Sequence, residues 1–334
     1  MFNQLIVISP LGLLYGSSGS FLSPENLVGR SGNRFPPSSA TVSGLFASVK
    51  DLDISNLRIA GPFWAKSNNP TNFFVPTPFN LLANKPLAQI NKENPDDGQI
   101  KYHLAWNSDD KQAWLDPNHE EISGKFDKES WLAIEQWHNP QQVYQAPWKY
   151  LPHLHPRLED NERKVVQNEQ KKGSLFLENA VQLDPDACLV YLSNQKLPDG
   201  WYRFGGEGHM VDIQSIELSD YVIELLNKPV GRQFALITPA VWGSNRLSCR
   251  LPESWKEDEL LDALLTDRPV TFRYRLGGQG STKRLSRGRY AVPAGTVYLL
   301  KSAIEKAWFY WDQDWFPKEG YPLSRWGCGL ALPL

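Results

Sequence analysis

The chain has 334 residues, of which 41% are hydrophobic and 22% are charged, and its formal net charge is −2. This composition is typical of a soluble globular protein of about two domains, and no run approaches the ~20 apolar residues that a membrane span requires. Three cysteines far apart in the sequence, Cys188, Cys249 and Cys328, form neither a disulfide framework nor a CxxC metal pair. We therefore expect a reducing compartment and a cytoplasmic protein.

The first 24 residues carry no charge, a property that they share with secretory signal peptides. No Lys or Arg precedes the apolar run 5–8, however, and Pro10 interrupts this run early. We therefore predict a short buried strand at 5–8, and neither secretion nor membrane insertion.

A helix is predicted directly after Pro36 and Pro37, capped by Ser38 or Ser39, because the residue before a proline avoids helical conformation. Between residues 26 and 50 there is no acid, and two arginines, Arg30 and Arg34, precede the helix. A helix N-terminus with free amides beside two cations can bind a phosphate. The alternative is an ordinary capped helix beneath a loop.

The middle of the chain is predicted to be loop-rich. We expect a strand at 57–64, an extended aromatic connector at 70–86, a helix at 126–137 and a loop at 140–156. Residues 91–135 hold eleven acids against five lysines and read as an acidic insertion, either solvated or facing a basic partner. The charged segment 157–172 is either a protruding hairpin arm or a surface loop.

The second half repeats one local pattern. Trp201-Tyr-Arg-Phe-Gly-Gly-Glu-Gly208 resembles Arg273-Tyr-Arg-Leu-Gly-Gly-Gln-Gly280, which indicates two related half-structures. We predict strands at 174–177, 188–192, 211–218, 233–238, 270–276 and 295–300, helices at 220–227 and 256–265, and a closing strand after a glycine turn. This order is typical of an α+β protein with two ferredoxin-like (RRM-like) domains, at 1–198 and 199–334, with glycine-rich loops and long insertions.

The most basic stretch lies near the C-terminus. Residues 268–304 contain eight cations and no acid, although the whole protein is slightly acidic. Gly277, Gly278 and Gly280 permit positive φ and expose backbone amides between two predicted strands. The stretch is therefore either a binding surface for an extended polyanion or a solvated, Arg-rich hairpin.

Motifs for small-molecule chemistry are absent from the sequence. It contains no P-loop, no G-x-G-x-x-G that opens a helix, no G-x-S-x-G, no H-E-x-x-H and no His/Cys zinc cluster. His209, after the first glycine cluster, is the single histidine placed like a base for RNA cleavage, and it lacks an evident second catalytic group. We expect no enzyme, no cofactor and no metal.

Several segments together resemble one known family, and they run in order across nearly the whole chain. They are Phe35-Pro-Pro-Ser-Ser-Ala-Thr-Val-Ser-Gly-Leu-Phe-Ala47, Gly61-Pro-Phe63, 74–82, 173–178, Arg203-Phe-Gly-Gly-Glu207, Ala291-Val-Pro-Ala-Gly-Thr-Val-Tyr298 and Trp326-Gly-Cys-Gly-Leu-Ala331. The set resembles the RAMP-superfamily subunit that caps the CRISPR RNA (crRNA) in type III-B effector (Cmr) complexes, the third Cmr subunit. The acidic insertion at 91–135 matches no pattern of that family.

The resemblance implies a subunit that holds the 5′ tag of the crRNA and contacts the large polymerase-like subunit and the first backbone RAMP subunit. It implies no target-cutting activity. The RNA-binding residues carried over from motif and charge are Arg30, Arg34, Ser38, Ser39, Arg203, Gly205, Gly206, His209, Gly278 and Gly280, with Lys283, Arg284, Arg287 and Arg289 as phosphate partners. Tyr202, Trp242 and Tyr290 are candidates for stacking on unpaired bases.

Two other functions remain open from the sequence. One is a RAMP-type endoribonuclease that processes crRNA precursors with His209 as general base. The other is a scaffold that meets proteins through its acidic insertion and its aromatic loops.

Overall fold

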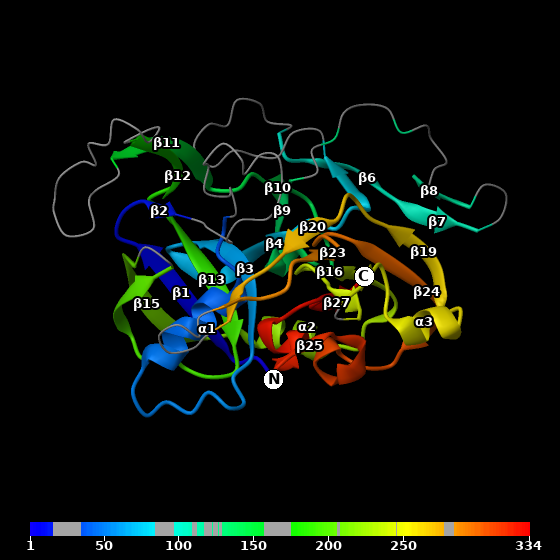
Figure 1. Ribbon diagram of the computed structural model, residues 1–334. Coiled ribbons are helices and arrows are strands. Elements are labelled where there is room, and N and C mark those ends of the chain that lie inside the picture. The colour runs from blue at the N-terminus through cyan, green and yellow to red at the C-terminus, as the bar shows by residue number, and fades with distance from the viewer. Residues whose placement is uncertain are drawn as a thin grey trace.

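The computed structural model describes residues 1–15, 35–83, 97–108, 112–116, 122, 126, 129–156, 175–205, 208–244, 246–276 and 284–334. These residues form a β-rich α+β protein built on two large antiparallel sheets, which lie side by side (Figure 1). No helix among them is long and apolar enough to cross a bilayer.

The first sheet has eight strands in the order β10-β9-β4-β3-β13-β1-β15-β14. Its strands are β10 (Val143–Tyr144), β9 (Trp131–Ala133), β4 (Asn69–Pro76), β3 (Ile59–Lys66), β13 (Ala187–Ser193), β1 (Gln4–Pro10), β15 (His209–Glu217) and β14 (Gly200–Phe204). Strand β1 is central because Ile6 lies opposite Tyr191 on one side and Ser215 on the other. All of β13 is buried, as expected for a strand covered on both faces.

Successive side chains of the first sheet enter two different cores. Ile6 and Ile8 face helix α1 (Ser39–Ser48), whose Val42, Leu45 and Phe46 are buried in the same cluster. Leu5 and Val7 face the other core, which also contains helix α2 (Asp220–Asn227) and most of the C-terminal half. The second core therefore joins the two sheets.

The second sheet has four strands in the order β19-β24-β16-β27. They are β19 (Leu261–Leu265), β24 (Val297–Ile304), β16 (Gly231–Leu236) and β27 (Ala331–Pro333). When the four strands are numbered along the chain, their spatial order is second, third, first, fourth. The first sheet contains four neighbouring strands, β3-β13-β1-β15, with the same spatial order.

The remaining strands form small sheets at the periphery. Strands β11 (Trp148–Pro156), β12 (Leu175–Leu183) and β2 (Leu14–Tyr15) make a three-stranded sheet, and β5 (Leu81–Ala83) pairs with β6 (Ile100–His103) and β7 (Ala105–Asn107) with β8 (Ala113–Leu115). Near the C-terminus, β17 (Trp242–Gly243) pairs with β18 (Ser248–Cys249), β20 (Val270–Phe272) with β23 (Arg289–Ala291), β21 (Arg275–Leu276) with β22 (Arg284–Leu285), and β25 (Lys318–Glu319) with β26 (Tyr321–Pro322).

Several predicted elements are confirmed. The strands expected at 5–8, 57–64, 188–192, 211–218 and 233–238 are present within a few residues, and helix α1 begins at Ser39 after the two prolines. Helix α2 has the predicted bounds, and the Oγ of Ser219 accepts a hydrogen bond from the backbone N–H of Val222 at its N-terminus.

Three predictions from the apolar pattern were wrong. Residues 126–137 contain β9 and the 3₁₀ helix η2 (Ile134–Gln136), because Leu132 pairs with Val75 of β4 and adds a strand to the sheet. Residues 140–156 contain β10 and β11 where we expected a loop. Residues 256–265 contain the end of the short helix α3 (Glu253–Glu257) and then β19, with Glu259 at φ +47 between them.

The first sheet includes strands up to residue 217. Strands β14 and β15, at 200–217, belong to the first sheet because β15 pairs along the whole length of β1. The second sheet begins with Gly231 of β16. Residues 157–172, expected as an arm or loop, lie outside the described residues, and β11 and β12 on either side of them pair from Trp148–Leu183 to Pro156–Leu175.

A turn near the C-terminus attaches the second half of the chain to the first sheet. The 3₁₀ helix η6 (Leu323–Trp326) ends at Gly327, which has φ +68. A Cβ at Gly327 would overlap Ala60 of β3 and lie 3.0 Å from the carbonyl oxygen of Ile59. Glycine is required here for its backbone conformation and for the close approach.

We predict that Gly327→Ala destabilises the protein by more than the ~1–2 kcal/mol of left-handed backbone strain alone, because the turn must also move away from β3. The measurement is urea unfolding of the full chain. Gly231→Ala is the matched control, since Gly231 has φ +70 and a methyl group added to it would meet no atom within 4 Å. Equal losses in the two variants would show that the contact with Ala60 contributes nothing.

Candidate nucleic-acid interface

The N-terminus of helix α1 is held firmly by the first sheet. The hydroxyl of Tyr191 donates to the carbonyl oxygen of Pro37 at 2.6 Å, and the Oγ of Ser39 donates to that of Gly61 at 3.0 Å. Ser39 is buried, so of the two predicted serines only Ser38 is partly exposed. The side chain of Ser38 caps no backbone amide, and the first turn contains no acid. This helix end therefore presents amides and a hydroxyl without a competing carboxylate.

The first glycine cluster forms the turn between β14 and β15. Gly205 has φ +75 and Gly208 φ +66, and the N–H of Gly208 donates to the carbonyl oxygen of Gly205 at 3.4 Å. Arg203 is exposed, and its side-chain carbons lie above Gly208. Phe204 is buried in the core beneath α1, and α1 packs against β14. The turn and the start of the helix thus belong to the same packed unit.

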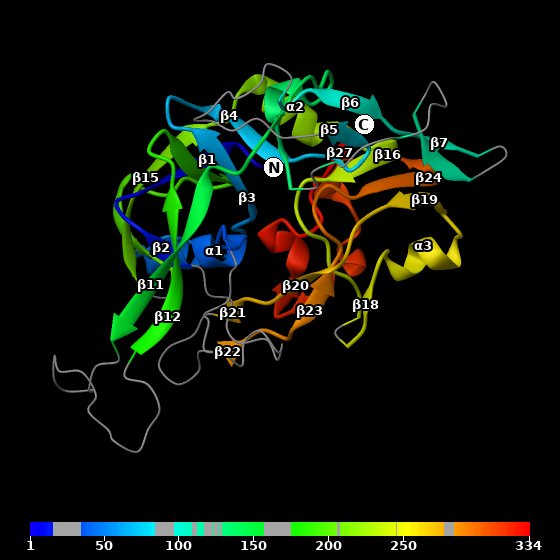
Figure 2. The ribbon, with the colours of Figure 1, turned by 90° about the horizontal axis from the view of Figure 1, so that it is seen from above.

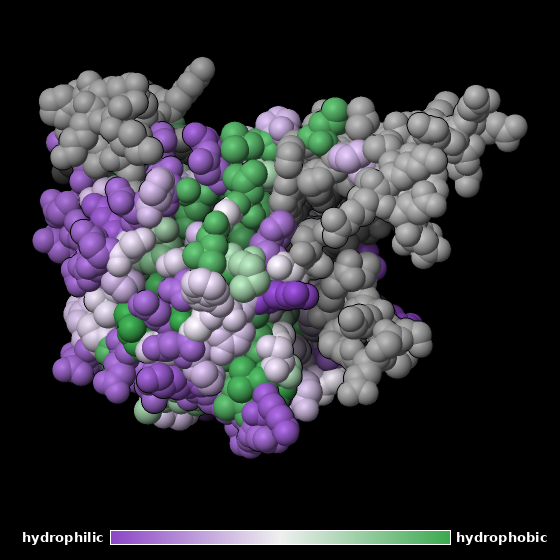
Figure 3. Space-filling view, turned by 90° about the vertical axis from the view of Figure 1, so that its left-hand side faces the viewer, coloured by the Kyte–Doolittle hydropathy of each residue, from purple (hydrophilic) through white to green (hydrophobic). Residues whose placement is uncertain are grey.

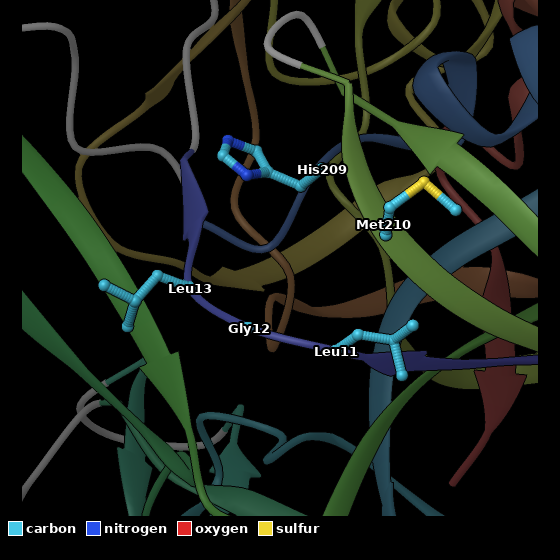
Figure 4. A pocket seen from close by; sticks show the side chains of 5 residues that line it. All are labelled: Leu11, Gly12, Leu13, His209 and Met210. Atoms are coloured by element: carbon cyan, nitrogen blue, oxygen red, sulfur yellow. The ribbon is translucent and has the colours of Figure 1, made fainter.

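His209 lies beside a hollow of about 360 Å³ that is otherwise lined by Leu11, Gly12, Leu13 and Met210 (Figure 4). The N–H of Leu11 donates to the carbonyl oxygen of Met210 at 3.1 Å, which joins the end of β1 to the start of β15. Figure 3 shows the side of the molecule that carries β15, where a band of hydrophobic residues crosses a largely polar surface. Leu11, Gly12, Leu13 and Met210, the other described residues of this lining, carry no carboxylate.

The C-terminal acid-free stretch contains a basic ribbon, which we define as the described residues of strands β20 to β23, 270–276 and 284–291; its glycine cluster lies outside the described residues. Arg287 is exposed on the turn before β23, whereas Arg289 is only 4% exposed. The guanidinium of Arg289 lies 2.7 Å from a carboxylate oxygen of Glu319. The N–H of Arg287 donates to the other oxygen of Glu319 at 3.1 Å. Glu319 therefore neutralises one cation of the ribbon and fixes the backbone of the next.

Hydrogen bonds across the ribbon complete this arrangement. The N–H of Tyr274 donates to the Oγ of the buried Ser286 at 2.9 Å, and the N–H of Ser286 donates to the carbonyl oxygen of Tyr274 at 2.8 Å. The Nε of Arg273 donates to the carbonyl oxygen of Ser286 at 3.0 Å. Burial, with Glu319 as a smaller cause, raises the pKa of Tyr274 well above its usual range, so its hydroxyl stays neutral.

Trp326 of η6 connects the ribbon to helix α1. Its ring lies 5.1 Å from that of Tyr274, and its Nε1 donates to the Oγ of Ser43 at 3.3 Å. Ala40 of α1 packs in the same cluster. The ribbon therefore runs to the side of the molecule where α1 lies, as seen in Figures 1 and 2. Two acid-free segments that are far apart in the sequence meet here.

The predicted site residues differ in their exposure to solvent, and some lie outside the described residues. Arg30, Arg34, Gly206, Gly278, Gly280 and Lys283 lie outside the described residues. The backbone of Arg284 pairs with Leu276. Ser38, Arg203, Gly205, His209 and Arg287 lie at exposed or half-exposed positions, whereas Ser39 and Arg289 are buried and bonded within the chain. The two buried residues hold the helix and the ribbon in place.

The three residues predicted to stack on bases also differ in exposure. Trp242 is fully buried, and its Nε1 donates to the hydroxyl of Tyr298 at 3.0 Å, so its prediction as a stacking platform was wrong. Tyr202 is half-buried, and its hydroxyl donates to the carbonyl oxygen of Pro198 at 2.7 Å. Tyr290, in the ribbon, is 54% exposed.

Sequence reasoning missed Glu319, Ser286 and Trp326. Glu319 lies thirty residues from Arg289 and outside the acid-free run, so no local charge pattern links the two. Trp326 was noted only as part of a terminal motif, and its contact with Ser43 spans 283 positions.

A model of a protein family matches residues 34–333, and its description is "CRISPR-associated protein (Cas_Cmr3)". The match covers most of the chain, so this protein belongs to the Cas_Cmr3 family of CRISPR-associated proteins. The family resemblance drawn from the sequence motifs is thereby confirmed.

Solved structures give matches of lower similarity. A chain of the type III-B Cmr-beta complex bound to cognate target RNA and AMPPnP is 12% identical, with a TM-score of 0.47, and the match covers 88% of this chain and 86% of that one. A chain of the Csm3-Csm4 subcomplex of a type III-A interference complex is 11% identical, with a TM-score of 0.38 and coverage of 91% and 94%. No curated protein matches the chain.

We predict that Glu319→Ala lowers the free energy of unfolding by about 3–5 kcal/mol, because it removes the carboxylate that pairs with the buried guanidinium of Arg289. Chemical denaturation measures the loss. The control is Asp314→Ala, which removes the carboxylate of an exposed pair with Lys318 on the same segment and should change stability little. If the two variants behaved alike, Glu319 would not be the residue that holds the ribbon.

Proposed function

We propose that this protein is a non-catalytic crRNA-binding subunit that holds the 5′ tag of the crRNA in a type III-B effector and joins the large polymerase-like subunit to the RAMP backbone. Membership of the Cas_Cmr3 family supports this role. The observation that carries the proposal is the junction at Trp326, where helix α1 and the basic ribbon pack together. Unpaired RNA is bound by backbone amides, cations and aromatic faces, and these two elements offer all three.

The proposal also assigns two ferredoxin-like domains to the chain. In the second sheet, and among strands β1, β3, β13 and β15 of the first sheet, the strand that comes first along the chain lies between the third and the fourth. Helix α1 connects the first and second strands of one sheet, and helix α3 lies on the corresponding connection of the other. This repeated strand order supports two ferredoxin-like units with long insertions; in the first unit, strand β14 takes the place of a helix between β13 and β15.

In this role some arginines contact RNA and others stabilise the protein. Arg287, exposed on a turn fixed by Glu319, binds a phosphate of the tag together with Arg203 and the amides at the start of α1. Arg289 supports the turn from within and contacts no RNA. His209 acts as a packing and hydrogen-bonding residue beside the RNA rather than as a base.

We predict that the double variant Arg284→Ala/Arg287→Ala weakens binding of a tag-containing crRNA by about tenfold or more, because charged hydrogen bonds to phosphate are lost. The slope of log affinity against log salt should become shallower by about 0.7 for each lost phosphate contact. Fluorescence anisotropy over a salt series measures both quantities. Arg232→Ala, on the second sheet, is the control, and unchanged affinity of the double variant at low salt would remove the ribbon from the interface.

We predict that the purified protein leaves crRNA repeat RNA intact, and that His209→Ala changes nothing in this assay. The physical reason is that acid–base cleavage of RNA needs a second group beside the histidine, and Leu11, Gly12, Leu13 and Met210, which line the hollow with His209, carry none. Denaturing gels of labelled repeat RNA give the measurement. Cleavage by the wild type that disappears in His209→Ala would instead establish the processing endoribonuclease.

A further inference from the structure

Strand β14 carries the most exposed tryptophan of the protein. Trp201 is 72% exposed, whereas the other tryptophans are buried or partly buried. Most of its indole is therefore in contact with solvent and open to a ligand. Tryptophan is enriched where proteins bind partners, because its large flat ring loses much contact with water when it is covered.

Alternation along β14 puts Trp201 and Arg203 on one face of the strand. Tyr202 and Phe204 point to the other face, where Phe204 is buried in the core that contains helix α1 and Tyr202 packs against this core. Arg203 is exposed, as Trp201 is. Because a strand rises about 3.3 Å per residue, the two side chains leave the backbone about 6–7 Å apart. An exposed ring and an exposed cation are therefore neighbours on the outer face.

The adjoining strand β15 completes this outer face. Arg203 lies opposite Met210, and Trp201 lies opposite Asp212. Met210 is 40% exposed, and Asp212 is partly exposed. Leu11, whose N–H donates to the carbonyl oxygen of Met210, is also exposed. The face thus combines an aromatic ring, a cation, apolar side chains and one carboxylate, on the side of the molecule shown in Figure 3.

The same face continues into the glycine turn that follows β14. Gly205 and Gly208 both have positive φ. A Cβ added to Gly208 would lie 3.7 Å from the Cδ of Arg203, so the arginine side chain extends over the turn. The indole, the guanidinium and the turn therefore form one continuous surface. Backbone groups, cations and aromatic faces together are the combination that binds unpaired nucleic acid, which favours RNA over a protein as the partner.

We propose that Trp201 stacks on a base of the crRNA tag and that Arg203 binds the phosphate beside that base. This inference rests on the proposed function and adds to it a residue that orients the bound strand. Stacking tolerates any base, because every base has a π face. Asp212, opposite Trp201, repels phosphate, so the backbone of the RNA lies towards Arg203 and the base towards the indole.

Trp201 takes the role that the sequence predicted for its neighbour Tyr202. The hydroxyl of Tyr202 donates to the carbonyl oxygen of Pro198, and its ring packs against the core that contains α1. Tyr202 therefore faces away from Arg203. The sequence pattern alone did not separate the two aromatic residues, because the pairing of β14 with β15 decides which of them faces outwards.

The test is fluorescence anisotropy of the full chain with a tag-containing crRNA over a salt series. Trp201→Ala should weaken binding at least fivefold, because a stacked base is lost. The slope of log affinity against log salt should stay unchanged in this variant, since no phosphate contact is removed, whereas Arg203→Ala should make the slope shallower by about 0.7. Trp201→Phe keeps an aromatic face and should recover most of the affinity.

Tyr310→Ala is the matched control. Tyr310, on the 3₁₀ helix η4 (Trp308–Tyr310), is 57% exposed, and its removal should leave the RNA affinity unchanged. Urea unfolding checks that Trp201→Ala keeps the stability of the wild type, as expected when an exposed side chain is truncated.

The outcomes separate this inference from the proposed function. If the wild type binds the RNA and Trp201→Ala binds it equally well, the stacking assignment is wrong while tag binding stands; weaker assembly of that variant with another subunit would then identify a protein-binding surface. If the wild type binds no RNA, both proposals fail. A loss in Trp201→Ala that Trp201→Phe does not recover, or a shallower salt slope in Trp201→Ala, would also overturn the stacking assignment.

Discussion

The position of the C-terminal half relative to the first sheet depends on the packing of the turn at Leu323–Trp326 and Gly327 against that sheet. Gly327 lies against Ala60 of β3, the guanidinium of Arg325 donates to the carbonyl oxygen of Ile54, and Trp326 bonds to Ser43 of helix α1. These contacts come from three successive residues, and they place the C-terminal half beside the α1 face. Through Trp326, this turn also connects Tyr274 of the basic ribbon to helix α1.

One carboxylate outside the ribbon, that of Glu319, binds two of its arginines. A loop with several cations and no local acid would repel itself, and Glu319 supplies the missing counter-charge from a neighbouring hairpin. The same carboxylate binds the backbone of Arg287, so an exposed cation is presented from a fixed position. A pre-positioned guanidinium loses less conformational freedom when it binds a phosphate than one on a mobile loop.

The first sheet carries two hollows with opposite chemical characters. The one beside His209 is lined mostly by apolar side chains, while the one on β3 and β4 is lined mostly by Lys66 and by asparagine and glutamine side chains. Both lie on the first sheet, and the order of its strands β3-β13-β1-β15 is repeated in the second sheet. One topology used twice therefore leaves room for different surfaces, since insertions and edge strands differ between the copies.

Local signals in the sequence determined much of this protein. Short apolar segments predicted β1, β13, β15 and β16, paired prolines predicted the start of α1, and ordered motifs placed the chain in its family. Helical spacing failed at 256–265, where pairing of Leu264 with Tyr298 decides the strand, and at 131–133, where β4 does so. Only the tertiary structure decided that Arg289 is buried, that Trp242 is core and that Trp326 joins the halves. Burial and charge pairing depend on contacts between residues tens to hundreds of positions apart, and such contacts leave no mark on a local pattern.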